Sequence, residues 1–207
     1  MDGATPTIFV IDDDAQVRSA LARLLRTRGM QVATFASGRE FLAWHVPDGP
    51  ACLVLDVRLS QEENGLVLQE HLRTSPRDLP IIFLTGYGTI PLCVQALKAG
   101  AVDFLQKPVD ESTLLEAIGK ALAEDQCTQR TRGTQAVLAQ RAATLTPRER
   151  EVMALVVTGL LNKQIAAGLG TSEKTIKIHR AHVMQKMQAA TLPELVRMAH
   201  AVGLGEL

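Results

Sequence analysis

Side chains suited to phosphoryl and metal chemistry recur in the first 107 residues of the chain, each near the end of a short apolar run. They are Asp12, Asp13, Asp14, Asp56, Thr85 and Lys107. Carboxylates that lie close together repel one another unless a cation neutralises them, and Mg²⁺ prefers such oxygen donors. A carboxylate can attack phosphorus, while a metal ion, a lysine and a hydroxyl stabilise the charge of the transferring group. These residue types indicate phosphoryl transfer to a carboxylate, provided that the fold brings them together.

The apolar runs predict the elements that would do so. Strands are expected at Thr7–Ile11, Gln31–Phe35, Cys52–Leu55, Ile81–Leu84 and Val102–Leu105. Most of these runs are continuously apolar, as in parallel strands covered on both faces, and amphipathic helical patterns separate them. Five strands alternating with five helices indicate a doubly wound, flavodoxin-like α/β domain with a parallel five-stranded sheet. Since functional sites of such sheets lie at the carboxyl ends of the strands, we expect the reactive side chains to converge there.

Asp14 and Lys107 also have ordinary structural explanations. An Asp after a strand often caps the next helix, which accounts equally well for Asp14. Lys107-Pro108 after a strand could simply form a turn. The occurrence of acidic, hydroxyl and basic residues at four different strand ends favours a reactive site over these alternatives.

Beyond the strands the pattern is helical throughout. The polar segment Glu124–Thr144, rich in Gln and Arg, predicts a helical linker with a weak point at Gly133. Thr146-Pro147-Arg148-Glu149 has the residues of a capping box and begins the first of four predicted helices. The other three are expected at Asn162–Leu169, Ser172–Met187 and Leu192–Val202.

The longest of these helices has two kinds of face. Ile176, Val183 and Met187 fall on one stripe, which we expect to be buried. Other faces carry Lys174, Lys177, Arg180 and Lys186, interleaved with Ile178 and Ala181. Such a surface suits a helix in the major groove of DNA, where basic side chains meet phosphates and apolar ones approach thymine methyl groups. By charge alone, a solvated helix face is the favoured explanation.

Charge and composition set the broad class. The chain is neutral overall, but residues 146–207 contain eight Lys and Arg against five Asp and Glu, so the excess of basic residues lies in the helical part. An acidic first part and a basic second part favour nucleic-acid contact by the second. Three cysteines form no disulfide framework or metal spacing, and no apolar run is long enough to span a bilayer. We expect a cytoplasmic protein without a signal peptide or membrane contact.

Four segments, "VIDDD", "LVLDVR", "IIFLTGYG" and "AVDFLQKP", resemble the receiver domain of two-component response regulators. The resemblance implies that Asp56 is the phosphoacceptor and that Mg²⁺ is the cofactor. It implies metal binding by Asp13 directly, by Asp12 largely through water, by Asp56, and by the main-chain carbonyl of Arg58. It further implies that Lys107 pairs with the phosphoryl group, across a cis peptide before Pro108, and that Thr85 and Phe104 form the switch pair. Plain core packing remains an alternative for Phe104.

One segment departs from that family. Relatives usually have a Pro and a short turn after the acceptor strand, whereas this chain has "DVRLSQEENGL", without Pro and about one residue longer. The loop Leu59–Asn64 also holds the acidic pair Glu62-Glu63. The departure leaves loop shape, partner recognition and phosphoryl lifetime open, but removes no residue of the chemistry.

The helical part, from "LTPREREVMALVV" to "TIKIHRAHVMQKM", resembles the LuxR-type helix-turn-helix, and together the two resemblances cover nearly the whole chain. The pattern "HRAHVMQKM…LPELVRMA" is similar to the FixJ branch of the NarL/FixJ family. The resemblance implies groove or base contacts by Lys177, Ile178 and Ala181, and phosphate contacts by Lys163, Thr175 and Arg180. The last helix is expected either to form a dimer contact on DNA or to pack on its own domain.

These expectations combine into a phosphorylation-controlled transcription factor. We expect a receiver domain at residues 1–123, a linker at 124–144 and an all-α helix-turn-helix domain at 145–207. The implied partners are a sensor histidine kinase, double-stranded DNA with two half-sites, a second copy of the phosphorylated chain and, as a further candidate, RNA polymerase. Activation is favoured over repression. The chain itself would catalyse only Mg²⁺-dependent self-phosphorylation and slow self-dephosphorylation.

Two alternatives stay open. A DNA-binding protein with a vestigial receiver would regulate without phosphorylation, although the set Asp12, Asp13, Asp56, Thr85 and Lys107 argues against it. A phosphatase with an Asp nucleophile would turn over phosphate esters, but such enzymes carry the nucleophile after the first strand.

Overall fold

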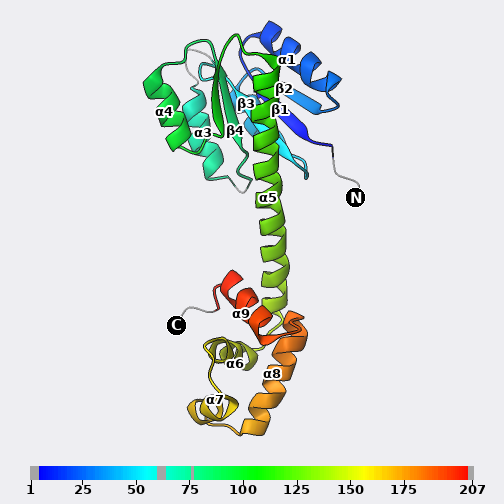
Figure 1. Ribbon diagram of the computed structural model, residues 1–207, viewed down its shortest axis with the longest axis vertical. Helices are drawn as coiled ribbons and strands as arrows, with labels where there is room; N and C mark the ends of the chain where they lie inside the picture. Colours follow the sequence, from blue (N-terminus) through cyan, green and yellow to red (C-terminus); the bar gives the residue numbers. More distant parts are fainter. Residues whose placement is uncertain (1–4, 60–63, 76, 205–207) are drawn as a thin grey trace. The chain divides into compact units, whose positions relative to one another are not determined.

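The computed structural model describes residues 5–59, 64–75 and 77–204. Two compact units divide the chain, Met1–Thr128 and Gln129–Leu207. The first is an α/β unit, and the second contains only helices within its described residues (Figure 1). The boundary between the two units, after Thr128, falls inside residues 124–144, the segment expected to be a linker.

A single parallel sheet forms the centre of the first unit, in the strand order β2-β1-β3-β4-β5. The strands are β1 Thr7–Ile11, β2 Gln31–Phe35, β3 Ala51–Leu55, β4 Ile81–Thr85 and β5 Asp103–Gln106. β1 and β2 match the predicted bounds, β3 begins one residue earlier, β4 ends one residue later, and β5 is shifted by one residue at both ends. β5 lies one residue later than expected because its pairing with β4 continues to Thr85 and Gln106.

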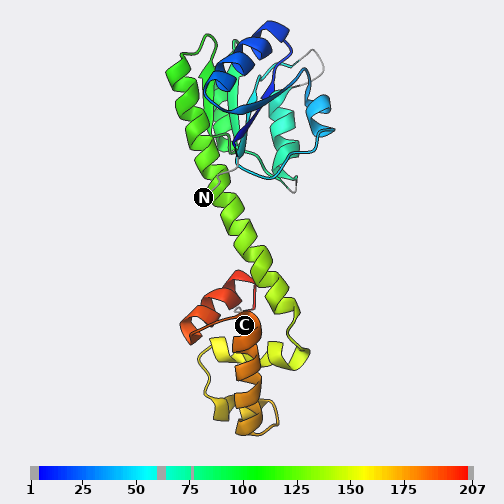
Figure 2. The same ribbon diagram turned by 90° about the vertical axis from the view of Figure 1, so that its right-hand side faces the viewer.

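Helices cover both faces of this sheet (Figures 1 and 2). They are α1 Ala15–Thr27, α2 Gly38–Leu42, α3 Gly65–Arg73, α4 Ile90–Lys98 and α5 Glu111–Ala143. One apolar core combines buried residues of α1 and α5 with Ile8, Val10 and Ile82. The other packs α2, α3 and α4 against Phe9, Leu53 and Phe83. Since alternate residues of a strand point to opposite faces, both faces of β1, β3 and β4 are apolar.

The register of the sheet places the strand ends level with one another. Ile11 pairs with Leu55, so the residues that follow them, Asp12 and Asp56, leave adjacent strands side by side. On the other side of β4, the Lys107 N–H donates to the carbonyl of Thr85 at 2.9 Å. The ends of four strands therefore deliver their side chains to one edge.

Asp14 caps helix α1, which is the structural role expected from the sequence as an alternative for this residue. Its carboxylate accepts from the backbone N–H of Gln16 at 2.7 Å and of Val17 at 3.4 Å, at the start of α1. These bonds satisfy donors that a helix start otherwise leaves unpaired.

The helix α5 runs through the expected linker without a break at Gly133. Its Asp125 is only 2% exposed and accepts from the backbone N–H of Ala51 at 2.8 Å. Arg77 donates to the carbonyl of Gly49 at 2.6 Å and lies 3.4 Å from the same Asp125 carboxylate. α5 is thus held against the amino end of β3 as far as Asp125.

Four further helices pack in the second unit: α6 Pro147–Val157, α7 Asn162–Gly168, α8 Glu173–Met187 and α9 Leu192–Ala201. Thr146 and Glu149 form the predicted capping box at the start of α6. The predicted stripe of α8 is buried, with Ile176, Val183 and Met187 at most 1% exposed. Nowhere in the described part of the chain is a helix both long and apolar enough to cross a membrane.

Candidate functional site

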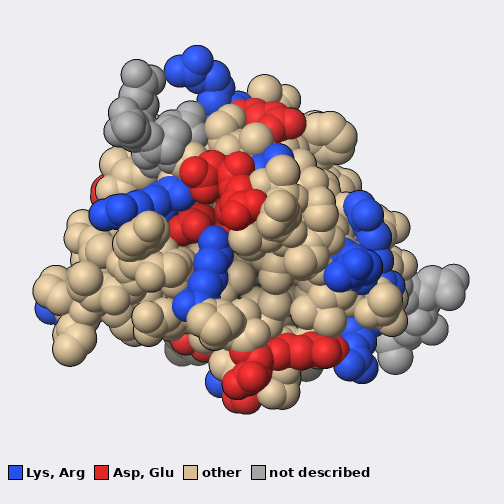
Figure 3. All heavy atoms as spheres, turned by 90° about the horizontal axis from the view of Figure 1, so that it is seen from above, with Lys and Arg blue, Asp and Glu red and all other residues tan. Residues whose placement is uncertain are grey.

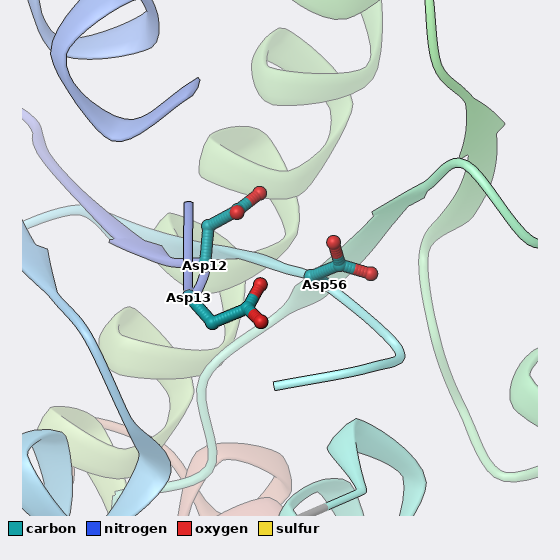
Figure 4. Close-up of side chains that lie close together, drawn as sticks. All are labelled: Asp12, Asp13 and Asp56. Atoms are coloured by element: carbon teal, nitrogen blue, oxygen red, sulfur yellow. The ribbon is translucent and has the colours of Figure 1, made fainter. Parts of the chain in front are cut away.

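Three carboxylates meet at the carboxyl edge of the sheet (Figure 4). Oxygen atoms of Asp12, Asp13 and Asp56 all lie within 4.8 Å of one another. Asp12 is 2% exposed and Asp56 8%, whereas Asp13 is exposed. In Figure 3, which views the molecule from above, acidic side chains gather near the centre of the face with basic side chains beside them. The cluster is open to solvent on the side of Asp13.

Lys107 joins the two buried carboxylates. Its Nζ donates to Oδ2 of Asp12 at 2.5 Å and to Oδ2 of Asp56 at 2.6 Å. Burial raises the pKa of Asp12, and the bond from Lys107 opposes that rise only in part. Burial alone would lower the pKa of Lys107, but its bonds to both carboxylates reverse this and raise it. Lys107 is therefore a cation held against the carboxylate expected to accept the phosphoryl group.

The donor set fits Mg²⁺. All three clustered side chains offer carboxylate oxygens, which this ion prefers, and one lysine cannot neutralise three of them. The Asp12 and Asp56 oxygens also accept backbone N–H bonds from Asp14 at 2.9 Å and Arg58 at 3.1 Å, which hold both side chains in place. Arg58, expected to contribute its carbonyl, lies two residues after Asp56 and pairs with Asn64 in an isolated bridge.

Thr85 and Phe104 lie near the same edge. Thr85 is fully buried at the end of β4, and its hydroxyl accepts from the backbone N–H of Tyr87 at 3.3 Å. Phe104 lies partly buried on β5, with its ring centroid 6.0 Å from that of Phe83. A Cβ at Gly88 would lie 3.0 Å from the Phe104 ring and 3.8 Å from the Thr85 methyl group. The two expected switch residues therefore border a common space, while core packing also accounts for the ring in this conformation.

The peptide between Lys107 and Pro108 is cis, as the resemblance implies. The loop Leu59–Asn64, which differs from the family pattern, can be compared with that pattern less fully. Its residues 60–63, including Glu62 and Glu63, lie outside the described residues.

Sequence reasoning missed two residues that shape this site. Arg18 on α1 donates to the carbonyls of Asp12 at 2.7 Å and Asp13 at 3.0 Å, which fixes the backbone of the acidic turn. A Cβ at Gly65 would lie 2.4 Å from the carbonyl oxygen of Asp56, so only glycine lets α3 begin this close to the acceptor. An amphipathic helix pattern gives no signal for the first contact, and a glycine after a loop gives only a weak one for the second.

The residues expected at DNA lie on α7 and α8. On α8, Lys177, Ile178 and Ala181 are all exposed, and Ile178 shows 49% of its surface. Lys163 is exposed on α7, while Thr175 is partly buried and its hydroxyl lies 2.8 Å from that of Ser172. In α8, residues three and four apart share a face, so Lys177 and Ala181 are neighbours.

Arg180 is held more firmly than its proposed neighbours. Its Nη1 donates to Oδ1 of Asn162 at 2.8 Å, which joins the start of α7 to α8. A guanidinium has five N–H donors, so this bond leaves others for a phosphate.

Comparisons with known proteins agree with this geometry. The profile of the response regulator receiver domain matches residues 8–119. The profile of bacterial regulatory proteins of the luxR family matches residues 143–199.

Relatives match over nearly the whole chain. Nodulation protein W of Bradyrhizobium diazoefficiens is 47% identical over 95% of this chain and 86% of its own length. Transcriptional regulatory protein FixJ of Rhizobium meliloti is 39% identical over 96% of this chain and 97% of its own.

Among solved structures, the response regulator StyR is 44% identical, with a TM-score of 0.83 over 95% of this chain and 99% of its own. Full-length FixJ from B. japonicum is 39% identical, with a TM-score of 0.56 over 97% of this chain and 98% of its own. The chain therefore belongs to the NarL/FixJ family of two-component response regulators and is a transcription regulator with a receiver domain and a LuxR-type helix-turn-helix domain.

Proposed function

We propose that a sensor histidine kinase phosphorylates Asp56 and that this modification controls DNA binding by the second unit. One observation carries the proposal: Asp56 lies in the acidic cluster, nearly buried, with Lys107 Nζ 2.6 Å from its carboxylate. Burying a carboxylate is costly because desolvation disfavours its charge, and the pairing of Asp56 with Lys107 offsets that cost. The cluster supports a working receiver and gives no support to a vestigial one.

The chemistry requires little beyond positioning. An Asp56 oxygen attacks the phosphorus of a phosphohistidine, the P–O bond forms as the P–N bond breaks, and the imidazole leaves with the electron pair. Mg²⁺ held by Asp12, Asp13, Asp56 and the carbonyl of Arg58 would neutralise charge on the phosphoryl oxygens. Lys107 transfers one of its hydrogen bonds from a carboxylate to a phosphoryl oxygen. Self-phosphorylation from small donors and slow hydrolysis use the same residues.

Phosphorylation would be read out by Thr85 and Phe104. The Thr85 hydroxyl moves toward the phosphoryl oxygen and leaves its bond to Tyr87, and the Phe104 ring turns into the vacated space. Helix α4 would shift in response to phosphorylation. Its apolar residues Ile90, Val94 and Leu97 are 82%, 43% and 44% exposed. An exposed apolar face that is present on both copies favours a homodimer of the phosphorylated chain.

A dimer would place two helix-turn-helix domains on two half-sites of double-stranded DNA. Lys177, Ile178 and Ala181 enter the groove, where Ile178 approaches a base and Lys177 a base or a phosphate, while Lys163, Thr175 and Arg180 approach phosphates. Pairing the domains raises affinity through effective concentration. We further propose activation of transcription, with RNA polymerase as a candidate partner, and a cytoplasmic location because the DNA lies there.

Phosphorylation by a small phosphoryl donor, with and without Mg²⁺, tests the assignment. Intact mass should show one added phosphoryl group on the wild-type protein with Mg²⁺ and none on Asp56→Asn. The control Asp48→Asn, which alters a carboxylate outside the cluster, should behave as wild type. Full labelling of Asp56→Asn, or labelling without any divalent metal, would refute it.

A further inference from the structure

The carboxyl end of α8, the expected recognition helix, is tied to the last turn of α5. Arg141 Nη1 donates to the carbonyl of Met187 at 3.2 Å. Lys186 Nζ donates to the carbonyl of Thr144, one residue beyond α5, at 3.1 Å. The carbonyls at a helix end lack partners inside the helix, so the bond from Arg141 also caps α8. Two cationic side chains thus cross between the same two helix ends in opposite directions.

A buried carboxylate completes this connection. Lys186 Nζ also lies 2.6 Å from Oε2 of Glu149, a residue only 4% exposed. The same Glu149 oxygen accepts from the backbone N–H of Thr146 at 2.9 Å. Lys186 therefore links the end of α5 and the start of α6 to α8. Lys186 is partly exposed but Glu149 is buried, so removing Lys186 would leave a buried carboxylate without this cation, which is unfavourable.

Apolar packing reinforces the same connection. Ala142 and Leu145, which flank the end of α5, are 7% and 5% exposed and belong to one core cluster with Met187 and Val183. The end of α5 is therefore part of the second unit's core. Lys177, on the expected DNA-facing part of α8, lies nine residues before Lys186, or about 14 Å along the helix axis. The tie leaves that part of α8 unobstructed.

We propose that Arg141 and Lys186 are positioning residues that make the end of the linker helix and the recognition helix move as one body. The direction of α5 then sets the direction of α8. In a phosphorylated dimer this coupling fixes the separation at which two recognition helices fit their half-sites. The proposal rests on the proposed function, and it assigns to Lys186 an internal role in place of contact with DNA.

The test measures how strictly the protein demands one half-site spacing. Duplexes selected from a random-sequence library by phosphorylated full-length wild type are remade with one or two base pairs inserted or removed between the half-sites. Wild type should bind each duplex with an altered spacing about tenfold more weakly than the selected duplex. This loss is about what one hydrogen bond to a charged group contributes. Arg141→Met and Lys186→Met should bind the selected spacing more weakly and the altered spacings nearly as well. Their affinity for a single half-site should stay within about threefold of wild type, since the DNA-facing residues are unchanged.

Arg130→Met is the matched control. Arg130 lies on the same helix and is exposed, and its side chain makes no hydrogen bond or ion pair within the described residues. The Arg130→Met variant loses the same positive charge as Arg141→Met and should keep the wild-type preference for one half-site spacing. Unchanged preference in Arg141→Met, or equal losses at every spacing and at the single half-site, would overturn the proposal.

A second measurement needs neither DNA nor phosphorylation. Amide hydrogen exchange in Arg141→Met should rise together at residues 142–145 and 185–189, and stay unchanged around Lys177. Exchange that rises at only one of the two helix ends would refute the coupling. If the exchange result holds but phosphorylated wild type shows no preferred spacing, the proposed dimer on two half-sites fails and the mechanical link stands.

Discussion

The two units present their function in opposite ways. In the first, the reactive groups are buried and convergent: Asp12 is 2% exposed, Asp56 8% and Thr85 not at all. In the second, the residues expected in the groove of DNA, Lys177, Ile178 and Ala181, are exposed, whereas Thr175 and Arg180, expected at phosphates, are partly buried and bonded within the domain. Buried polar groups need partners and so constrain one another, whereas exposed ones vary independently. Substitutions should therefore act sharply in the first unit and gradually in the second.

The largest effect should follow loss of Lys107. In Lys107→Met the Asp12 and Asp56 carboxylates lose the cationic side chain that bonds to both of them, and the transferring phosphoryl group loses its charge stabilisation. We expect the rate of phosphorylation by a small donor to fall about a hundredfold, the effect of removing one such donor. The rate is measured by intact mass against time. Lys98→Met removes the same charge from an exposed site and should react as wild type; a Lys107→Met protein that reacts equally fast would show that the cluster does not act as a unit.

A smaller, graded effect is expected on the DNA surface. Lys177→Ala should weaken DNA binding and reduce the slope of log affinity against log salt by about one unit if it meets a phosphate. Ile178→Ala should cost less affinity and change the preference at one base pair. Affinities at several salt concentrations measure both, with Lys120→Ala on the first unit as control. Wild-type binding by both α8 variants would mean that another face of the second unit meets DNA.

Glu149 is an exception in the second unit, because it is buried, and it makes stability there depend on pH. The hydrogen bond from Lys186, followed by that from the Thr146 N–H, lowers the pKa of Glu149 from 4.5 to about 2. A lowered pKa favours the folded state above pH 4.5, and this contribution disappears as the pH falls from 4.5 toward 2.

Glu149→Gln should therefore be less stable than wild type at pH 6, with the difference narrowing as the pH approaches 3. Urea midpoints followed by circular dichroism measure it. Glu151→Gln, on the same helix but 55% exposed, should show little difference at any pH. If the difference in urea midpoint between wild type and Glu149→Gln stays constant from pH 6 to pH 3, Glu149 acts through packing and not through its charge.

The sequence predicts features that depend on local patterns better than contacts between distant positions. Strand bounds and capping residues follow from local patterns, so β1 and β2 and the Thr146 cap match their predicted positions. The acidic cluster was predictable because parallel strands must end at one edge.

Contacts from a side chain to a distant backbone carbonyl follow no such pattern. Arg18 to Asp12, and Arg141 to Met187 forty-six positions away, depend on how helices pack. Asp125 was placed in the linker by its polar neighbours, although burial against Ala51 makes it part of the first unit. The resemblance to the LuxR-type domain implies a phosphate contact for Arg180, but it gives no sign of the bond from Arg180 to Asn162.

We propose that the buried cluster of the first unit governs DNA binding by the second through dimerisation. Sedimentation of phosphorylated wild type beside phosphorylated Thr85→Ala tests this directly, at concentrations up to tens of micromolar, roughly the range of a weak dimer. Both proteins should carry one phosphoryl group by intact mass. We expect wild type to shift from monomer to dimer as its concentration rises, while Thr85→Ala stays largely monomeric. Phosphorylated wild type that remains monomeric, or a Thr85→Ala protein that dimerises equally well, would contradict it.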